Sequence, residues 1–555
     1  MHTPATTAPP RPAALPVLPA TLGDLLLKSR DRAPDAPALI FPDHRLTFGQ
    51  LADGAWAAAQ WLSGLGVGPG DRVGTIMLNS PDCVTLFFGA TMIGAVIVPI
   101  NARYRSYELE FLAKDAGLRV IVTNDTGRSH ADLSAIVADA LPGLADQPDP
   151  ANLNLPGFPD LRAVVDLAQA PRQGFLGPAD VARAARRADA ALLVRHAAGV
   201  AARSVAAIIY TSGTTSRPKG AMLSHEALVR GWMMVGRRWG VRPDDRFWDP
   251  CPLFHIAAIG PMIFTLGHGA AYVTDVHFDA GRAVRMLERE RATLLYPCYP
   301  PITQALITHP DFAAIDKSAV RVWLNVAPPE TLRRYDPAFP GARQITTYGQ
   351  TEGGPVSLGD PDDTPEARLS TCGSPIDGAE LRICDPDTGV ELPVGQLGEI
   401  HFRGYSAFSG YFNAPAKTAE TIDAQGWVHT GDAGVMDDNG RITFRGRIKE
   451  MMKVGGENVA PAEVEAFLEG HSAIRMVQAM GVPDRRLTEV VAAFVELEPG
   501  HSLTEAEVIA YCKGRLSSFK TPAIVRFVTE WPLSATKVQR NVLRQQLLDE
   551  LNQGG

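Results

Sequence analysis

Positions 210–220, YTSGTTSRPKG, combine small, hydroxylated and cationic residues as a phosphate-holding loop requires. Such clusters usually mark turns, so a linker is the alternative interpretation. A short buried strand is expected before the run, and Ser224 can cap a helix that passes through Trp232. A strand, a glycine-hydroxyl loop and a following helix form a common phosphate site, because backbone N–H groups converge there. The run is not a Walker loop, because its lysine precedes glycine and is not followed by Ser or Thr.

Three further stretches carry groups that a nucleotide or a metal ion needs. Glu352 follows the strand-like RQITTYG, at what should be the open end of a parallel sheet. One carboxylate with ATP oxygens and waters is a typical Mg²⁺ site, and a helix-start acid is the alternative. In GWVHTGDAG we expect Asp432 in a tight turn, where it can bind a ribose diol or close an Asx-turn. The stretch FRGRIKEMMKVGG places Arg447 and Lys449 at a boundary between two units.

The elements that must position these groups follow an α/β pattern. From about residue 21 to 122, strands such as RVGTIML and AVIVPI alternate with helices such as DCVTLFFGATMIG, which predicts βαβ units and a parallel sheet. Residues 142–178, rich in Pro, Asp and Gly, are expected to form an irregular surface excursion. The alternation resumes between 206 and 350, and short alternating strands fill 373–446.

The last hundred residues predict a compact α+β unit with its own helices and strands. We therefore expect a flexible tail at 1–20, a large α/β body with a β section at 21–447, and a small mobile α+β lid at 448–555. The hinge between body and lid is expected near Lys449.

Bulk composition excludes several classes of protein. The 555 residues, 45% hydrophobic and 21% charged, fit a globular chain of two or more units. The net charge of −8 gives no general electrostatic reason to bind nucleic acid. The most apolar run, 84–98, is shorter than the ~20 residues of a membrane span, so integral membrane association is not expected. Six single cysteines fit a reducing cytoplasm, without CxxC or Cys/His spacing for zinc. No pattern fixes the oligomeric state, and a homodimer remains open.

Taken in order, the motifs resemble the ANL superfamily of adenylate-forming enzymes: acyl-CoA synthetases, adenylation domains and firefly-type luciferases. The resemblance extends from about residue 21 to 548 and decides in favour of a phosphate loop. It rests on six motifs: 210–220, PLFHIAAIG at 252–260, YGQTE at 348–352, GYF at 410–412, TGD at 430–432 and GR at 446–447.

The resemblance implies two half-reactions with a small-molecule carboxylic acid, ATP accompanied by Mg²⁺, and CoA. The carboxylate attacks the α-phosphate to give an acyl-adenylate and pyrophosphate. The lid then swings about its hinge, and a thiol attacks the adenylate. Several fixed cations and N–H donors are needed because two anions must meet.

The resemblance also implies roles for individual residues. The loop would hold the β- and γ-phosphates, Tyr348 would pack on adenine, and Asp432 with Arg447 would hold the ribose hydroxyls. The ATP-binding positions are Thr211, Ser212, Gly213, Thr214, Thr215, Lys219, Tyr348, Gly349, Asp432 and Arg447.

Among the remaining positions, Glu352 would ligate Mg²⁺ and Thr351 would contact the α-phosphate. His255 would lie beside the entrance for the carboxylate and the acyl group. The positions that act with the lid are the hinge residue Lys449, Gly456 in the pantetheine tunnel, and Lys537, which bridges the substrate carboxylate and the α-phosphate.

Two departures from the family pattern affect these expectations. The stretch that usually reads Gly-Gly-Ala-Pro is here Asn325-Val326-Ala327-Pro328, so the shape of the adenine and acyl wall does not carry over. The lysine loop usually reads Thr-Gly-Lys, whereas here Thr536 directly precedes Lys537.

The expected activity is that of an acyl-CoA synthetase for an apolar acid. The segments that should face the acyl group offer no Asp for an amino group, which favours a medium- or long-chain fatty acid and then an aryl or alicyclic acid. An acyl-AMP ligase serving a carrier protein and a non-catalytic nucleotide-binding protein are the alternatives. The apolar residues expected to face the acyl group are Ile256, Ile259, Met262, Ile263, Phe264 and Tyr299.

Overall fold

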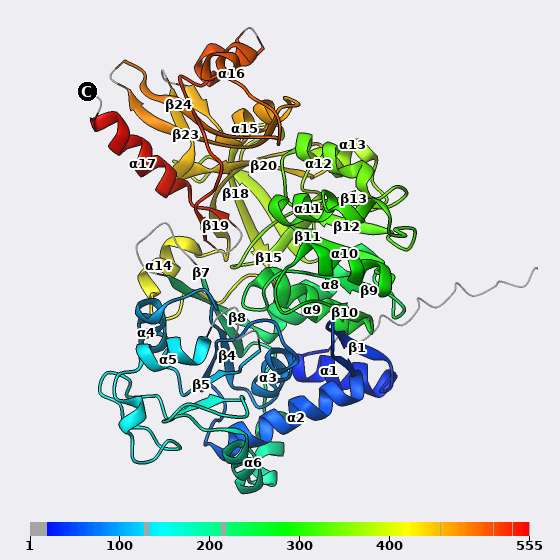
Figure 1. The fold of residues 1–555 in the computed structure, drawn as a ribbon, viewed down its shortest axis with the longest axis vertical. Coiled ribbons are helices and arrows are strands. Elements are labelled where there is room, and N and C mark those ends of the chain that lie inside the picture. The colour runs from blue at the N-terminus through cyan, green and yellow to red at the C-terminus, as the bar shows by residue number, and fades with distance from the viewer. Residues whose placement is uncertain are drawn as a thin grey trace, which may run out of the picture.

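The computed structural model describes residues 19–126, 132–211, 218–454, 457–484, 486–513, 515–534 and 537–553. Figure 1 shows a six-stranded sheet towards the bottom, a seven-stranded sheet in the middle and the small C-terminal unit at the top. This mixed α/β architecture confirms the predicted fold class.

The six-stranded sheet is parallel except for its last pair, and its order is β6-β5-β3-β4-β7-β8. Its first two strands in chain order, β3 and β4, are joined by a mostly buried helix over Pro81–Met92, as the βαβ pattern predicts. The strands are β3 (Arg72–Thr75), β4 (Val96–Pro99), β5 (Val120–Thr123), β6 (Ala163–Asp166), β7 (Val205–Thr211) and β8 (Lys219–Ser224).

The prediction of an irregular excursion at 142–178 is wrong in part, because β6 lies inside it and pairs in parallel with β5. All four residues of β6 are buried. The surrounding Pro, Asp and Gly residues hide so short a strand from a periodicity argument.

The seven-stranded sheet is also mainly parallel, with order β13-β12-β11-β9-β10-β1-β2 and one antiparallel pair at the β1–β2 edge. Its strands are β1 (Pro37–Ile40), β2 (Arg45–Thr47), β9 (Arg246–Trp248), β10 (Ala271–Val273), β11 (Leu294–Cys298), β12 (Val322–Asn325) and β13 (Arg343–Ile345).

Helices cover these two sheets. They are α1 (Leu22–Arg32), α2 (Phe48–Gly64), α3 (Pro81–Met92), α4 (Ser106–Asp115), α5 (Leu133–Ala140), α6 (Pro178–Arg187), α7 (Ala190–Ala198), α8 (Trp232–Trp239), α9 (Ile256–His268), α10 (Ala280–Arg289), α11 (Pro300–Ile307), α12 (Pro329–Tyr335) and α13 (Pro365–Ser370).

Antiparallel strands follow. They begin at Thr347, earlier than the change of pattern expected at residue 373, and the four-stranded sheet lies within the predicted range. A three-stranded sheet contains β14 (Thr347–Gln350), β15 (Gly354–Leu358) and β16 (Ser374–Pro375). A four-stranded sheet contains β17 (Ala379–Cys384), β18 (Gly398–Gly404), β19 (Val428–Met436) and β20 (Ile442–Arg447), and α14 (Pro415–Thr421) lies between β18 and β19 in the chain.

The C-terminal unit has its own hydrophobic cluster, drawn from residues between 452 and 525. Its elements are β21 (Met452–Val454), β22 (Glu457–Val459), α15 (Pro461–Glu469), β23 (Ile474–Asp484), β24 (Thr488–Leu497), α16 (Glu505–Cys512), β25 (Ile524–Phe527), β26 (Leu533–Ser534), β27 (Lys537–Val538) and α17 (Arg540–Gln553).

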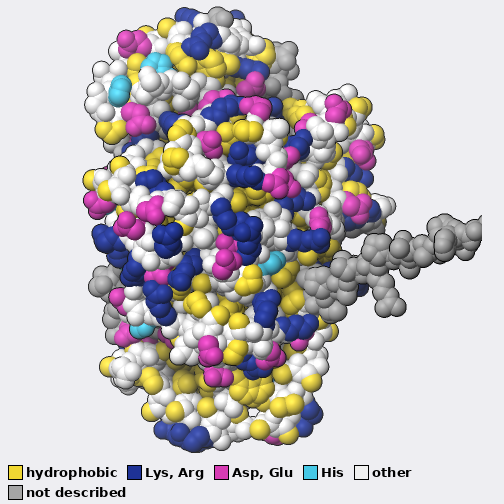
Figure 2. Space-filling view, turned by 90° about the vertical axis from the view of Figure 1, so that its right-hand side faces the viewer, with side chains coloured by type: hydrophobic (Ala, Val, Ile, Leu, Met, Phe, Trp, Pro, Cys, Tyr) yellow, Lys and Arg dark blue, Asp and Glu magenta, His cyan; other side chains and the backbone are white. Residues whose placement is uncertain are grey.

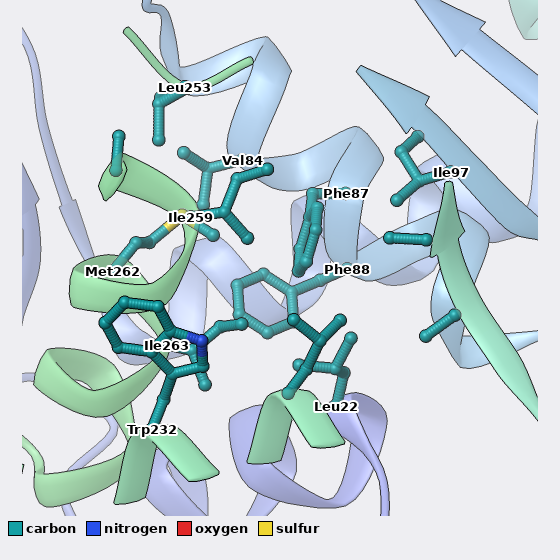
Figure 3. Close-up of a cluster of buried hydrophobic side chains, with 14 of the residues drawn as sticks. Leu22, Val84, Phe87, Phe88, Ile97, Trp232, Leu253, Ile259, Met262 and Ile263 are labelled. Atoms are coloured by element: carbon teal, nitrogen blue, oxygen red, sulfur yellow. The ribbon is translucent and has the colours of Figure 1, made fainter. Parts of the chain in front are cut away.

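The largest hydrophobic cluster joins helices from distant parts of the chain. In Figure 3, Phe88 of α3 lies close to Ile263 of α9 and to Trp232 at the start of α8. A Cβ on Gly260 would lie 2.0 Å from the Trp232 ring, so only glycine lets α9 approach that ring this closely.

The C-terminal unit contacts the body through α12 and α15. The Thr331 hydroxyl donates to Glu469 Oε2 at 2.7 Å, and the Arg334 guanidinium donates to the main-chain oxygens of Ile474 and Arg475. Burial raises the pKa of Glu469 to about 7. This polar contact fixes how the two parts sit in this structure.

The outer surface is mixed in character. On the face in Figure 2, Lys and Arg side chains are interspersed with Asp and Glu, and hydrophobic side chains are scattered between them. In the described ranges, no helix has both the length and the apolar character that a membrane crossing requires.

Candidate active site

The glycine-hydroxyl loop joins two antiparallel strands, β7 and β8, with Thr211 opposite Lys219. The sequence did not predict β8, which separates the loop from the expected helix. That helix itself is confirmed, because Ser224 Oγ accepts the N–H of Ala227 and a helical segment leads on into α8 at Trp232. β8 escaped the prediction because its residues pack on both faces and show no simple alternation. Ser212, Gly213, Thr214 and Thr215 lie outside the described residues.

Both ends of this loop have partners that the sequence did not reveal. The Tyr210 hydroxyl donates to Asp115 Oδ2 at 2.6 Å, and burial together with Asp115 raises the pKa of Tyr210. On the other strand, Lys219 Nζ lies 5.9 Å from the centre of the Tyr411 ring. Burial lowers the pKa of Lys219. The nearby charges of Lys417 and Lys449 lower this pKa further, whereas those of Glu420 and Glu352 raise it. Several cations therefore gather near the loop.

Glu352 lies in the turn between β14 and β15, so the alternative of a helix-start acid is wrong. The Tyr411 hydroxyl donates to Glu352 Oε1 at 2.7 Å, and the main-chain N–H of Phe408 donates to the Glu352 carbonyl. Burial and Glu352 together raise the pKa of Tyr411, so the phenol stays protonated as a donor. Thr351 is half-buried in the same turn, and Gly349 is exposed just before it.

Asp432 lies inside β19, and its expected place in a tight turn is wrong. The pairing of β18 with β19 contains an irregularity between Glu399 and His401, where β19 bulges and Gly431 has φ +69°. The bulge turns the backbone locally without ending the strand, which a TGD motif alone does not distinguish from a turn.

Three of the expected nucleotide residues meet at this bulge. Asp432 is 3% exposed; its Oδ2 accepts the Tyr348 hydroxyl at 2.7 Å, and its Oδ1 lies 2.9 Å from Arg447 Nε. Asp432 and Arg447 are cross-strand partners in β19 and β20. The Tyr348 ring stacks on Phe444 with centroids 5.8 Å apart, a contact that the sequence did not predict. An aromatic ring, a carboxylate and a guanidinium thus form one cluster.

His255 is half-buried at the residue before α9, with its ring 4.7 Å from that of Phe254. The expected acyl-facing residues divide into two groups. Ile256 and Tyr299 are half-buried, whereas four residues of α9 are at most 1% exposed and belong to the core: Ile259, Met262, Ile263 and Phe264. The first three of these are labelled in Figure 3. Their assignment to an open acyl pocket needs correction, because α9 directs them at α3 and α8.

A small apolar cavity of about 20 Å³ lies where α3 and α9 pack, lined in part by Phe87, Ile259 and Met262. It is far too small for an acyl chain, and pockets for small ligands occupy about 300–1,000 Å³. On the other expected wall, Val326 is 39% exposed and donates its N–H to the Cys298 carbonyl at 2.7 Å. Val326 therefore does add an exposed side chain where the family usually has glycine.

Of the residues expected to act with the lid, the structure describes Lys449 fully and Lys537 by its backbone alone. Lys449 is exposed in a single 3₁₀ turn (Ile448–Glu450) between β20 and β21. Lys537, at the start of β27, is the backbone partner of Ser534 at the end of β26. The connection between these two paired residues is therefore two residues long. The side chain of Lys537 and all of Gly456 lie outside the described part of the structure.

Comparison with known proteins agrees with this geometry. Residues 26–412 match the family model for AMP-binding enzymes, and residues 463–537 match that for the AMP-binding enzyme C-terminal domain. The chain belongs to the AMP-binding enzymes of the ANL superfamily, as the ordered motifs predict. It is an AMP-forming acid–CoA ligase that uses ATP and CoA.

Named relatives cover nearly the whole chain. The mitochondrial medium-chain acyl-CoA ligase of Rattus norvegicus is 32% identical over 96% of this chain and 88% of its own length. The 3-[(3aS,4S,7aS)-7a-methyl-1,5-dioxo-octahydro-1H-inden-4-yl]propanoyl:CoA ligase of Rhodococcus jostii is 34% identical over 95% of this chain and 99% of its own. ATP-bound MatB from Rhodopseudomonas palustris has the same fold, with a TM-score of 0.79 and 27% identity, covering 95% of this chain and 99% of its own.

Replacing Tyr411 with Phe should slow acyl-adenylate formation about tenfold, mainly through a higher KM for ATP. The variant removes one hydrogen bond to a charged group, worth about 1.5–3 kcal/mol, and leaves Glu352 free to change rotamer. Pyrophosphate release at varied ATP measures the effect. Tyr107→Phe is the matched control, because Tyr107 is 78% exposed. Equal kinetics for the Tyr411 variant and the control would show that Glu352 needs no such support.

Proposed function

We propose that this ligase activates an apolar monocarboxylic acid, with a medium- or long-chain fatty acid as the first candidate. The observation that carries the proposal is the Tyr348, Asp432 and Arg447 cluster, which offers a ring for adenine and a charged pair for ribose hydroxyls. For the acid, support comes from the half-buried Ile256 and Tyr299 near His255, and from the medium-chain name of the rat relative.

Mg²⁺ is proposed to accompany ATP at Glu352. The carboxylate is half-buried, and one of its oxygens is engaged by Tyr411, which leaves acceptor capacity on the other. Hard oxygen ligands of this kind fit Mg²⁺, which usually takes one or two carboxylates together with phosphate oxygens and water. The bound ion would neutralise phosphate charge as it is redistributed during adenylation.

In the first half-reaction, the substrate carboxylate oxygen bonds to the α-phosphorus and the bond to the β-phosphate breaks. We propose that Thr211 and Lys219, with the loop residues between them, hold the β- and γ-phosphates. Thr351 would contact the α-phosphate, and Gly349 would leave room beside Tyr348 for adenine. His255 would face the carboxylate entrance. Lys537 would place its ammonium between the two anions, since each preorganised donor or charge contributes about 2.7–4 kcal/mol to such a transition state.

In the second half-reaction, the CoA sulfur bonds to the acyl carbon, AMP leaves with the electron pair of the broken C–O bond, and the thiol proton is lost. We propose that residues 448–555 rotate about Lys449 between the two steps, and that Gly456 then lines the pantetheine path. The separate hydrophobic cluster of this unit and the exposure of Lys449 support that division.

An alicyclic or aryl acid is the second candidate substrate. It is favoured by the Rhodococcus jostii relative, whose name specifies a fused-ring propanoyl acid. The exposed Val326 changes the wall in which either substrate would lie. A carrier protein in place of CoA is the remaining alternative. The six free cysteines agree with the proposed cytoplasmic location, which localisation of a tagged chain would test.

The acid is identified by pyrophosphate release across a panel of butanoate, octanoate, palmitate, cyclohexanecarboxylate, benzoate and phenylalanine, each with and without CoA. We expect octanoate or palmitate to give the highest kcat/KM. Each buried methylene adds about 0.8 kcal/mol, or about fourfold. Highest activity with cyclohexanecarboxylate or benzoate would establish the second candidate. Turnover that requires a carrier protein instead of CoA would overturn thioester formation on CoA.

Lys537→Ala should slow adenylation by roughly 10²-fold, because one preorganised charge is lost. Thioester formation from preformed acyl-adenylate should change little, since the lid has moved by then. Lys520→Ala is the matched control, because Lys520 is already engaged with Glu463 Oε1 at 2.5 Å. An adenylation rate within about threefold of wild type would exclude Lys537 from the reaction.

Lys449→Pro should leave adenylation largely intact and abolish thioester formation. Proline fixes φ near −65°, so a hinge that must change its dihedrals cannot move. Lys449→Ala, which removes the same charge but keeps the backbone free, is the control. The two half-reactions are measured separately, by pyrophosphate release and by acyl-CoA formation from supplied acyl-adenylate. Equal losses in both would place the hinge elsewhere.

A further inference from the structure

Two histidines and a glutamate gather on the four-stranded antiparallel sheet, outside the residues assigned above. Among the residues that the structure describes, Glu399, His401 and His429 form a group whose potential metal-ligand atoms all lie within 4.8 Å of one another. Glu399 and His401 stand two positions apart on β18, and His401 is the cross-strand partner of His429 on β19. Strand geometry therefore directs all three side chains to one face of the sheet.

Both imidazoles face the same carboxylate oxygen. His401 Nε2 lies 3.0 Å and His429 Nδ1 lies 4.0 Å from Glu399 Oε2. The two rings lie side by side, with centroids 4.0 Å apart. Two ligand atoms that each lie about 2.0–2.1 Å from a tetrahedral zinc ion are about 3.3 Å from one another. This value lies between the 3.0 Å and 4.0 Å that separate the two imidazole nitrogens from the carboxylate oxygen. The cluster therefore has nearly the dimensions of a coordination shell.

Hydrogen bonds satisfy this cluster only in part. His401 is 1% exposed; its Nε2 contacts Glu399, and its Nδ1 is a buried polar atom without a hydrogen-bond partner. The 4.0 Å separation of His429 Nδ1 from the carboxylate is too long for a direct hydrogen bond. We propose that Glu399, His401 and His429 bind a divalent transition-metal ion of the zinc class.

The donor set selects the ion. Two imidazoles and one carboxylate suit Zn²⁺ or Co²⁺, whereas Mg²⁺ prefers oxygen ligands only. Asp423 Oδ2 lies 3.7 Å from His429 Nε2, where it can orient the ring that binds the metal. Arg382 lies 3.6 Å from the same Asp423 oxygen and balances its charge. A solvent molecule would complete the coordination of an ion held by these three side chains. The His429 side chain is 35% exposed, which gives the ion a path from solvent.

The site is connected to the nucleotide cluster through one hydrogen bond. Glu399 Oε1 accepts the N–H of Gly431 at 2.8 Å, and Gly431 immediately precedes Asp432 in the bulge of β19. A metal on Oε2 would fix the carboxylate and, through it, the backbone that carries Asp432. The ion would thus stabilise the bulge without touching the reacting groups.

Metal binding to the full chain tests the proposal. Chelator-treated protein without ATP is titrated with Co²⁺ and then with Zn²⁺, and bound metal is measured by equilibrium dialysis. We expect one equivalent of Co²⁺ with the strong visible absorption of a four- or five-coordinate ion, displaced by Zn²⁺. His401→Gln should weaken binding at least tenfold, because it removes one of three protein ligands. The control is His309→Gln, because His309 pairs with Asp311 in a turn far along the chain from β18 and β19. This variant should bind Co²⁺ as tightly as wild type does.

Two results would overturn the site: wild-type protein that binds no Co²⁺ or only a weakly absorbing six-coordinate ion, or a His401→Gln variant that binds as well as wild type. Near-ultraviolet circular dichroism checks that the variant is folded. If it is not, His429→Gln at the more exposed ligand makes the same comparison. The wild-type cobalt spectrum decides the question if neither variant folds.

Discussion

The arrangement of the active site depends on one buried carboxylate, that of Asp432. A charge that is 3% exposed must be paired or hydrogen-bonded, because burial without partners is costly. Here the partners come from two other strands, the Tyr348 hydroxyl on β14 and the Arg447 guanidinium on β20. Three segments that are far apart in the sequence are thereby held together. Since the next residues after Arg447 lead into the C-terminal unit, the same contact sets where that unit begins.

Much of this arrangement was predictable from the sequence, but for two different reasons. The parallel sheets followed from physical patterning, since buried strands and an amphipathic or apolar helix alternate as βαβ units require. The proposed roles of Glu352, Asp432 and Arg447 rest on motif order, because each residue alone has a commoner structural use. The side-chain partners of these residues, such as Tyr411 and Phe444, could not be predicted. Tyr411 and Glu352 are 59 residues apart in the chain, and the position of Phe444 depends on the register of β20 with β19.

The acyl side shows where sequence reasoning fails for a physical reason. Ile256 and Ile263 have the same side chain and lie on the same helix, yet one is half-buried and the other belongs to the core. Hydrophobicity predicts that a side chain is removed from water. It does not say whether a bound substrate or another side chain, such as Trp232, covers it. The same limit hid the pair His401 and His429, whose proximity depends on the register of β18 with β19 and on a bulge.

The contact of α12 with α15 has a consequence for protons. Glu469, whose ordinary pKa is 4.5, reaches about 7 because it is buried against the body, where the Thr331 hydroxyl contacts it. Between those two pH values the docked unit keeps a proton that an exposed glutamate would have released. If α15 separates from α12, the part of this shift that comes from burial against the body is lost, and Glu469 releases a proton between these two pH values. A pH above 7 then works against the docked arrangement, because burial disfavours the ionised carboxylate.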